Sequence, residues 1–349
     1  VEGDEITAPL ILLCIGSRPA IPAIENLEQV PYYTSDSILE IDEPPASMAI
    51  IGGGYIAAEY GHFFSAMGTS VTIIGRNPQF LPEVEPEVSA LAEKKMAAHM
   101  ILMTGHEVVA VSNNGDGKKG VQAVSREGAE KTIEVDSILL ATGRQSNSDL
   151  LKPQRSGIDV DQDGWIVVDE RLETTCANIW AFGDANGRHL FKHVANYEAR
   201  VVYYNAILKN TITVDYHAVP HAVFSYPEIA AVGMRESEAI AAVGEDSLLV
   251  GFHRYWNTAK GEAMGAKDYF AKLLVQRPSG KILGAHIIGP QASVLIQEIV
   301  ALMYSGDQTV NPIIYGMHIH PALSEVVERA CSALMPVQQY RERLEKGML

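Results

Sequence analysis

The chain has little cysteine, no long apolar run and few basic residues. Its three cysteines, Cys14, Cys176 and Cys331, are far apart in the 349 residues and show neither metal-binding nor redox spacing. We therefore expect them to be buried free thiols of a protein in the reducing cytosol. No apolar stretch approaches the roughly 20 residues that a membrane-spanning helix requires. These absences predict a cytoplasmic protein without a membrane partner.

Acidic residues outnumber basic ones by 43 to 27, which gives a formal net charge of −16. Because such a charge repels phosphates, neither nucleic acid nor an anionic membrane is expected as a main partner. With 47% hydrophobic residues, the chain can bury more than one core, so two or three domains are expected. Residues 6–15 already resemble a strand, close to a start at Val1. We therefore expect an N-terminal portion of the protein to precede this sequence.

Residues 48–61 (MAIIGGGYIAAEYG) combine a short apolar run, three glycines and a helix-forming segment. This order predicts a strand, a tight turn and a helix, as in dinucleotide-binding proteins. Gly52 would allow the turn, Gly54 would let backbone amides approach a pyrophosphate, and Ala57 would let the helix lie close to its strand. The pyrophosphate would sit at the positive N-terminal end of that helix. A glycine turn that binds nothing is the alternative, so the context decides.

The next predicted strand, residues 70–74, indicates which nucleotide is bound. NAD-binding proteins place an acidic residue about 20 residues after the first glycine, where it bonds the ribose 2′-hydroxyl. Here Gly75 and Arg76 occupy that place. No carboxylate repels a 2′-phosphate there and a guanidinium can pair with one, so NADPH is favoured over NADH. The alternative is that Arg76 is a solvated surface residue.

Asp184 follows a predicted buried strand, residues 179–182. It would therefore lie at the carboxyl edge of a sheet, where open α/β sheets bind ligands. The alternative role is a helix N-cap, because residues 185–204 are largely helical in pattern. The sequence alone leaves both roles open, and we favour the ligand role.

A histidine and a glutamate near the C-terminus are candidate catalytic residues. His320 precedes Pro321, which fits the first turn of a helix, and Glu325 follows where its carboxylate can bond the imidazole. Such a carboxylate would fix the tautomer and raise the pKa of the imidazole, which prepares it as a general base. A packing role at a helix start is the competing interpretation.

Secondary structure is expected to change in character near residue 217, from α/β to a mainly antiparallel sheet with flanking helices. Those helices, expected over residues 291–305, 321–334 and 338–346, are apolar enough to predict a subunit interface. Other expected elements are a helix start at 32–39, a helix over 87–100, a hairpin tip at 113–120 and one strand over 133–141.

Seven segments together resemble the FAD-dependent pyridine nucleotide–disulfide oxidoreductases, whose members include dihydrolipoamide dehydrogenase and glutathione reductase. They follow the order of that family along the whole chain. These segments are residues 15–19 (IGSRP), 52–59 (GGGYIAAE), 141–144 (ATGR), 181–184 (AFGD), 224–228 (FSYPE), 284–289 (GAHIIG) and 320–325 (HPALSE).

The resemblance implies an α/β fold with a Rossmann-like nucleotide-binding domain, a returning FAD-domain segment and a C-terminal α+β dimerisation domain. Its expected divisions are residues 1–32 (remnant of the FAD-binding domain), 33–146 (NAD(P)-binding domain), 147–216 (FAD-contacting segment) and 217–349 (dimerisation domain). The implied protein is a homodimer through the last of these.

The same resemblance implies roles for the cofactor-binding residues. Asp184, beside Gly183, would bond the ribityl chain of FAD, and Gly143 belongs to the matching ATGR segment. Tyr55 would gate the nicotinamide pocket. Glu59 would face the flavin and pair with a lysine near the redox disulfide.

In the family, hydride passes from NAD(P)H to FAD, and the electrons then pass through a Cys-x4-Cys disulfide to a disulfide substrate. By resemblance, His320, polarised by Glu325, would protonate the leaving thiolate while acting on the disulfide of the partner subunit. The FAD fingerprint, the Cys-x4-Cys pair and the lysine are missing from this sequence. We therefore expect a fragment that does no disulfide chemistry by itself.

Within the family, residues 192–196, 289–293 and 319–323 are similar to mycothione reductase, which we interpret as reduction of a small, low-molecular-weight disulfide. Two alternatives are a non-catalytic nucleotide-binding dimerisation module and a flavin reductase of a non-disulfide acceptor, such as a metal ion or quinone. The His320–Glu325 pair counts against the second. Which disulfide is reduced, and membership of a 2-oxoacid dehydrogenase complex, stay open.

Overall fold

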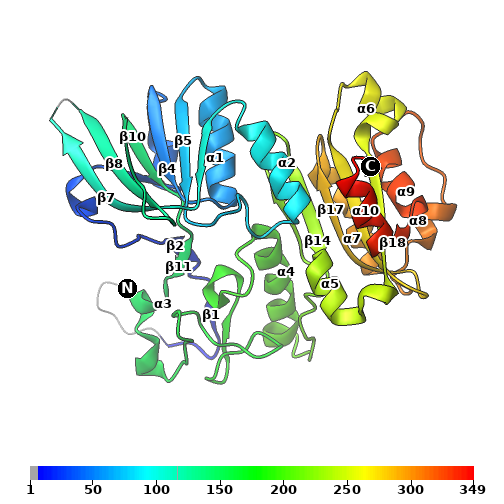
Figure 1. Cartoon of the computed structure of the whole chain (residues 1–349). Helices are drawn as coiled ribbons and strands as arrows, with labels where there is room; N and C mark the ends of the chain where they lie inside the picture. Colours follow the sequence, from blue (N-terminus) through cyan, green and yellow to red (C-terminus); the bar gives the residue numbers. More distant parts are fainter. Residues whose placement is uncertain (1–6, 116) are drawn as a thin grey trace. The chain divides into compact units, whose positions relative to one another are not determined.

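The structure is a computed structural model that describes residues 7–115 and 117–349. Residue 6 of the expected first strand and residue 116 of the expected hairpin tip lie outside the described residues. The fold is mixed α/β, as predicted (Figure 1). It divides into two compact units, one of residues 1–21 with 143–216 and one of residues 22–142 with 217–349. Every helix of the described part is too short or too polar to span a bilayer. The four-part division above stays a prediction.

The larger unit contains a five-stranded parallel sheet that carries the glycine-rich turn. Its strand order is β3 (Tyr33–Thr34), β10 (Ser137–Leu140), β4 (Ser47–Ile51), β5 (Ser70–Gly75) and β6 (Ile101–Thr104). Helices α1 (Tyr55–Ala66) and α2 (Pro86–Met96) follow β4 and β5 in the chain. The strands β4 and β5 are buried apolar runs, as a parallel sheet covered on both faces requires.

The expected strand over residues 133–141 is wrong, because two strands of different sheets share it. The first, β9 (Glu130–Val135), belongs to an antiparallel sheet with β7 (His106–Asn114) and β8 (Lys118–Ser125), which form the expected hairpin. Asp136 separates β9 from β10, and its side chain accepts a 2.6 Å hydrogen bond from Ser47 and pairs with Lys118. These contacts turn the chain from one sheet into the other.

Two expected helices are shorter than predicted. Helix α2 ends at Met96 rather than at Met100. The helix start at residues 32–39 is strand β3 followed by a 3-10 turn, Ser37–Glu40. Here the Thr34 hydroxyl accepts hydrogen bonds from the backbone amides of Asp36 and Ser37. The other 3-10 turns of this unit are Leu27–Gln29, Glu245–Ser247 and Tyr255–Asn257.

The C-terminal part of this unit is a six-stranded antiparallel sheet, as predicted. Its order is β13 (Pro220–Val223), β14 (Ile229–Gly233), β17 (Lys281–Ile288), β16 (Phe270–Gln276), β15 (Leu248–Arg254) and β18 (Met335–Pro336). The accompanying helices are α5 (Glu236–Val243), α6 (Ala259–Ala263), α7 (Ala292–Met303), α8 (Asn311–Tyr315), α9 (Ser324–Ser332) and α10 (Val337–Glu345). Helices α7 and α9 contribute buried apolar residues to one core with this sheet.

The smaller unit is built on two short strand pairs. Strand β1 (Ile11–Leu13) pairs in parallel with β12 (Ile179–Ala181), and β2 (Ser17–Pro19) pairs antiparallel with β11 (Arg144–Ser146). Its helical segments are α3 (Ser148–Leu151), the turns Pro153–Ser156 and Gly183–Asn186, α4 (Lys192–Val202) and the π-turn Tyr203–Ile207. The helix expected over residues 185–204 therefore begins later, at Lys192.

Candidate functional site

The glycine turn leads from β4 into α1 and leaves open space at the start of the helix. Gly52 has a φ of 132°, and a Cβ there would lie 2.1 Å from the carbonyl oxygen of Ala141, so only glycine fits. Gly54 precedes α1, and a Cβ there would meet no atom within 4 Å. No side chain caps α1, and Ala57 in its first turn is fully buried. The start of α1 is thus an uncapped helix N-terminus with open space at Gly54, an environment that suits an anion.

The residues expected to read the ribose lie at the end of β5. Gly75 is the last residue of this strand and is buried, whereas Arg76 is exposed. A Cβ on Gly75 would approach the Cα of Gly53 to 3.1 Å, so the turn and the strand end are in close contact. A carboxylate at position 75 would crowd the turn. Tyr55, the first residue of α1, has an exposed side chain.

Glu59 lies in the second turn of α1 and accepts a 2.9 Å hydrogen bond from the backbone N–H of Phe224. Burial raises the pKa of Glu59, although this hydrogen bond opposes the shift. Sequence reasoning missed the contact with Phe224, which connects positions 165 residues apart. The only indication in the sequence was that Glu59 and Phe224 both lie in segments that resemble the same family.

In the smaller unit, Asp184 lies in the turn that follows β12. Its carboxylate accepts a 2.6 Å hydrogen bond from the Ser17 hydroxyl and lies 3.9 Å from the guanidinium of Arg144. The N-cap interpretation is wrong, because α4 begins only at Lys192 and the turn is a separate 3-10 segment. Gly143, with a φ of 104°, accepts from the N–H of Ala20 and so joins β2 to β11.

The Asp184 turn is held by Glu198, which sequence reasoning missed. Glu198 is fully buried and accepts hydrogen bonds from the Gly183 N–H (2.6 Å), the Asn186 side-chain amide (2.9 Å) and the Tyr216 hydroxyl (2.5 Å). Burial raises the pKa of Glu198, and the three donors oppose this shift. The available signal was its position on the buried stripe of α4, between Val194 and Val202.

His320 and Glu325 form the predicted pair. Nδ1 of His320 lies 2.9 Å from Oε1 of Glu325. Glu325 also accepts from the N–H of Ala322 and lies near Arg329; the hydrogen bond to His320 is the largest cause that lowers its pKa. The side chain of His320 is 64% exposed, whereas that of Glu325 is only 8% exposed. The carboxylate thus fixes an imidazole that reaches into solvent.

The expected local structure around this pair needs one correction. Helix α9 begins at Ser324, so Pro321 is not in its first turn and His320 lies on the preceding loop. The loop is fixed from the other side by His318, whose Nε2 lies 3.1 Å from Glu298 of α7. His318 therefore pairs with Glu298 and not with the Glu325 carboxylate.

The cysteines differ from the expectation that all three are buried. All three are free, as expected, but Cys14 is exposed, Cys176 is half-buried and only Cys331 is buried. Cys14 directly follows β1, which within residues 7–115 and 117–349 pairs with β12 alone, so little of the described structure covers it. Burial raises the pKa of the Cys331 thiol, which makes it a poor nucleophile.

Comparison with known proteins identifies the family. The pyridine nucleotide-disulphide oxidoreductase model matches residues 1–204, and the dimerisation-domain model of the same family matches residues 219–331. Mycothione reductase of Mycobacterium tuberculosis is 40% identical over 338 residues, which are 95% of this chain and 72% of that relative. Dihydrolipoyl dehydrogenase of Synechocystis sp. is 32% identical over 343 residues, with the same coverage of 95% and 72%.

A solved structure agrees with these matches. The HOCl-induced flavoprotein disulfide reductase RclA from Escherichia coli matches with a TM-score of 0.84 and 26% identity, over 94% of this chain and 74% of that one. The fold, the order of motifs and both family models thus agree with the resemblance inferred from the sequence. The chain belongs to the pyridine nucleotide-disulphide oxidoreductase family.

Proposed function

We propose that this protein, a disulfide oxidoreductase by family, is a cytoplasmic homodimer that uses NADPH and FAD to reduce a low-molecular-weight disulfide. The His320–Glu325 pair carries the proposal, because an exposed imidazole held by a carboxylate suits proton exchange with a substrate thiol. The 40% identity to a mycothione reductase supports a small thiol disulfide as the substrate class.

The residues present fit both cofactors of the family. The amides that begin α1, beside Gly54, would hold the pyrophosphate of NADPH, and Tyr55 would lie over its nicotinamide. Asp184, oriented by Ser17 and Arg144, would bind the ribityl hydroxyls of FAD. Bound FAD would supply two-electron transfer between the nicotinamide and a disulfide.

His320 would act on the thiol side of the reaction. Because Nδ1 is engaged by Glu325, Nε2 is the nitrogen that would give a proton to the departing thiolate of the substrate. Protonation makes that thiolate a better leaving group and prevents it from attacking the mixed disulfide again. Glu325 would stabilise the imidazolium that carries the proton on Nε2, and would hold the neutral ring as the Nδ1–H tautomer after that proton has left.

The redox cysteines that this reaction needs are not among residues 1–349, so we propose that another part of the protein contributes them. Exposed apolar side chains in β1 support this proposal. Ile11 and Leu12 are 41% and 44% exposed although they lie in a parallel strand, where both faces are normally covered. Further strands of an FAD domain would cover them. This chain alone is therefore proposed to be inactive in disulfide reduction.

The test uses the full-length protein with NADPH and NADH against mycothione, lipoamide and glutathione disulfide. His320→Gln is expected to lower the turnover of the preferred disulfide by about 10²- to 10⁴-fold. Reduction of the flavin by NADPH, measured by stopped-flow absorbance, is expected to be unchanged, because it precedes the step at His320.

His318→Gln is the matched control, because it changes a neighbouring histidine that pairs with Glu298 rather than with Glu325. It should retain most of the turnover. Disulfide reduction that proceeds at the wild-type rate in His320→Gln would contradict the proposed role, and a full-length protein without bound flavin would contradict the proposed function.

The choice of NADPH is tested by Arg76→Glu. A side chain at position 75 would crowd the glycine turn, because Gly75 contacts it. The carboxylate is therefore introduced at position 76. We expect the KM for NADPH to rise at least tenfold while the KM for NADH changes little, since a carboxylate repels the 2′-phosphate. An equal rise in both values would show that Arg76 does not read this phosphate.

A further inference from the structure

Residues 76–87 connect the strand end that is proposed to read the ribose with the first turn of α2. The middle of this segment rests on the glycine turn, since the N–H of Leu81 donates a 3.0 Å hydrogen bond to the carbonyl of Gly53. Leu81 has a φ of 51°, a conformation that a non-glycine residue rarely adopts. The side chains of Phe80 and Leu81 are buried in the same core as α1. The shape of this segment therefore affects the position of both Gly53 and Arg76.

The far end of the segment is fixed by a buried lysine from another part of the chain. Lys272 of β16 is 1% exposed, and its Nζ lies 3.2 Å from Glu85, 2.5 Å from Glu87 and 2.8 Å from Glu236. Glu85 and Glu87 belong to residues 76–87, and Glu236 begins α5. The buried Lys272, the buried Glu85 and Glu236 and the half-buried Glu87 form a charge cluster that neither the glycine turn nor the His320 site uses.

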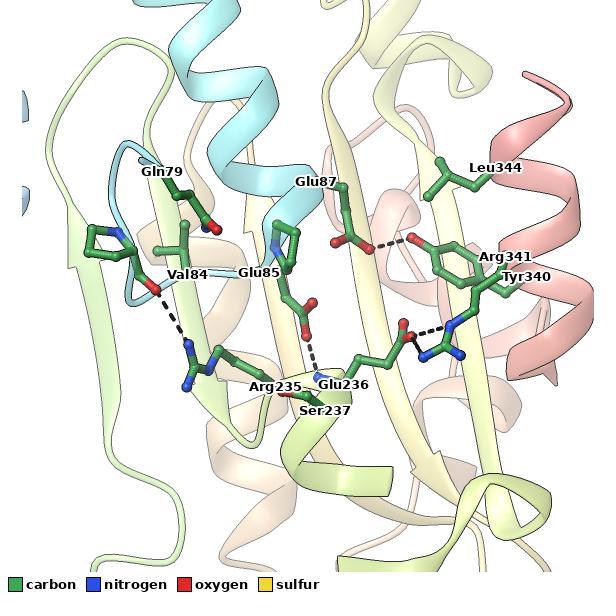
Figure 2. A pocket seen from close by; sticks show the side chains of 12 residues that line it. Gln79, Val84, Glu85, Glu87, Arg235, Glu236, Ser237, Tyr340, Arg341 and Leu344 are labelled. Atoms are coloured by element: carbon green, nitrogen blue, oxygen red, sulfur yellow. Dashed lines mark hydrogen bonds and ion pairs between the residues drawn. The ribbon is translucent and has the colours of Figure 1, made fainter. Parts of the chain in front are cut away.

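Further polar contacts surround these charges (Figure 2). The Tyr340 hydroxyl donates to Glu87 at 2.6 Å, and the Arg341 guanidinium donates to Glu236 at 2.9 Å. The backbone N–H of Glu236 donates to Glu85. Strand β16 and helices α5 and α10 thus all bind the start of α2 through polar groups.

A cavity of about 300 Å³ lies beside the cluster, lined by residues of this segment, of α5 and of α10. Figure 2 shows Glu85, Glu87 and Glu236 directed toward this space. Since side chains do not fill the space, close packing does not fix the segment on this side. Hydrogen bonds and ion pairs must do so, including the bond from Arg235 to the carbonyl of Pro82.

We propose that the cluster of Lys272, Glu85, Glu87 and Glu236 is a positioning site for the pyridine nucleotide, which holds residues 76–87 in the shape that places Arg76 and the glycine turn. The proposal rests on the proposed nucleotide site at Gly52–Arg76. Without the lysine, Glu85, Glu87 and Glu236 would be closely spaced carboxylates that repel one another, two of them buried. The start of α2 would separate from α5 and β16, and the segment leading back to Arg76 would move with it.

The experiment measures binding of NADP⁺ and NAD⁺ to the full-length flavoprotein by isothermal titration calorimetry, for the wild type and for Lys272→Met. We expect the Kd for NADP⁺ to rise at least tenfold in the variant. Amide hydrogen exchange in residues 76–87 should become faster, while exchange in α7 should not change. Methionine retains most of the volume of lysine, so the loss of charge is the main change.

Tyr255→Phe is the matched control. Tyr255 is a fully buried residue of the same antiparallel-sheet region, and its hydroxyl donates to the carbonyl of Pro290. We expect this variant to lose some thermal stability and to keep the Kd for NADP⁺ within twofold of the wild type. A general loss of stability would therefore be distinguished from a loss of positioning.

Tyr340→Phe replaces Lys272→Met if the latter does not fold, because it removes only the hydrogen bond to Glu87. It should raise the Kd for NADP⁺ about threefold and speed exchange in residues 76–87. A wild type that binds neither nucleotide would overturn the proposed nucleotide site itself. A wild type that binds NADP⁺, together with a cluster variant that folds and has an unchanged Kd, would overturn the positioning role alone.

Discussion

At the scale of single residues, Glu198 connects the interior of the smaller unit to Asp184. In Glu198→Ala, the Gly183 N–H, the Asn186 amide and the Tyr216 hydroxyl would lose their acceptor. We expect the free energy of unfolding to fall by roughly 3 kcal/mol or more, because each buried unpaired donor costs about 1–3 kcal/mol. The flavin content of the purified full-length variant should fall as well. Urea unfolding and the ratio of flavin to protein absorbance measure the two effects.

Asn205→Ala is the control for this prediction. Asn205 is also buried in the smaller unit, but its amide donates to the carbonyls of Arg171 and Ile212 rather than to the Asp184 turn. The Asn205→Ala protein should be less stable than the wild type and yet retain its flavin. A Glu198→Ala protein with the flavin content of the wild type would show that the turn keeps its shape without the carboxylate.

His286 predicts a dependence of stability on pH. Burial, assisted by the charge of Lys272, lowers the pKa of His286 to about 3, so its 3.5 Å contact with Glu85 is not an ion pair at neutral pH. Between pH 6.5 and 3 the unfolded chain binds a proton at this residue and the folded chain does not. Stability is therefore complete above pH 6.5 and is lost as the pH falls, at about 1.4 kcal/mol per unit.

His286→Gln should reduce this dependence, since glutamine does not titrate and can still donate to the carbonyl of Met234, the present acceptor of the ring N–H. The measurement is the free energy of urea unfolding from pH 7 to pH 5, for the wild type and the variant. If the two slopes are equal, the imidazole does not stay neutral on folding.

The sequence predicted some site residues and missed others for a physical reason. Gly52, Asp184 and His320 lie in local motifs, where the spacing itself expresses the chemistry. Ser17 contacts a residue 167 positions away, and Glu198 contacts residues 12 to 18 positions away, so no local pattern could assign either to the Asp184 turn. The charged position of Glu198 on an apolar helix face was visible, but its three donors were not.

At the scale of elements, the turn between β4 and α1 allows two glycines to be compared. Gly52→Ala would place a Cβ 2.1 Å from the carbonyl oxygen of Ala141 at a φ of 132°, so we expect a loss of at least 2 to 3 kcal/mol of stability, or no folding. In Gly54→Ala, the new Cβ would meet no atom within 4 Å, so this variant should fold normally. Its methyl group would instead occupy the space for the pyrophosphate, so the Kd for NADP⁺ should rise at least tenfold.

Thermal melting and calorimetric titration separate these two effects. Each variant is the control for the other. Gly52 is expected to be required for folding, and Gly54 for nucleotide binding. Normal nucleotide binding by a stable Gly54→Ala protein would argue against a pyrophosphate at the start of α1.

The elements themselves were predicted well where one apolar pattern belongs to one strand or helix. The prediction was wrong for residues 133–141, because two consecutive strands have the same β-type composition and only Asp136 separates them. The start of α9 was also misplaced, because Pro321 fits a helix start but equally fits the loop that carries His320. Tertiary contacts determine the structure at both places. Ser47 bonds Asp136 between the two strands, and Glu298 bonds His318 in the loop before α9.

At the scale of the whole molecule, exposed apolar side chains lead us to predict where a second subunit binds. Residues 315–319 alternate, so that His318 points inward to Glu298 while Tyr315, Met317 and Ile319 are 83%, 102% and 79% exposed. The dimerisation domain of the family includes this loop. The sequence predicted an interface from the apolar helices, but α7 and α9 use most of their apolar residues in the core of the unit. The loop therefore adds exposed apolar surface to what the helices leave exposed, such as Val294 of α7, which is 65% exposed.

Met317→Glu should therefore weaken the homodimer. A carboxylate placed in an apolar interface must be desolvated without a partner, which we expect to raise the dimer dissociation constant by at least a hundredfold. Sedimentation velocity at several protein concentrations measures this constant. Because His320 is proposed to act on the disulfide of the partner subunit, turnover should fall in parallel with the dimer fraction and recover at high protein concentration.

Glu328→Gln, a charge change on the nearby helix α9, is the control and should leave the dimer intact. A monomeric Met317→Glu protein with full turnover would show that each subunit completes the reaction with its own histidine.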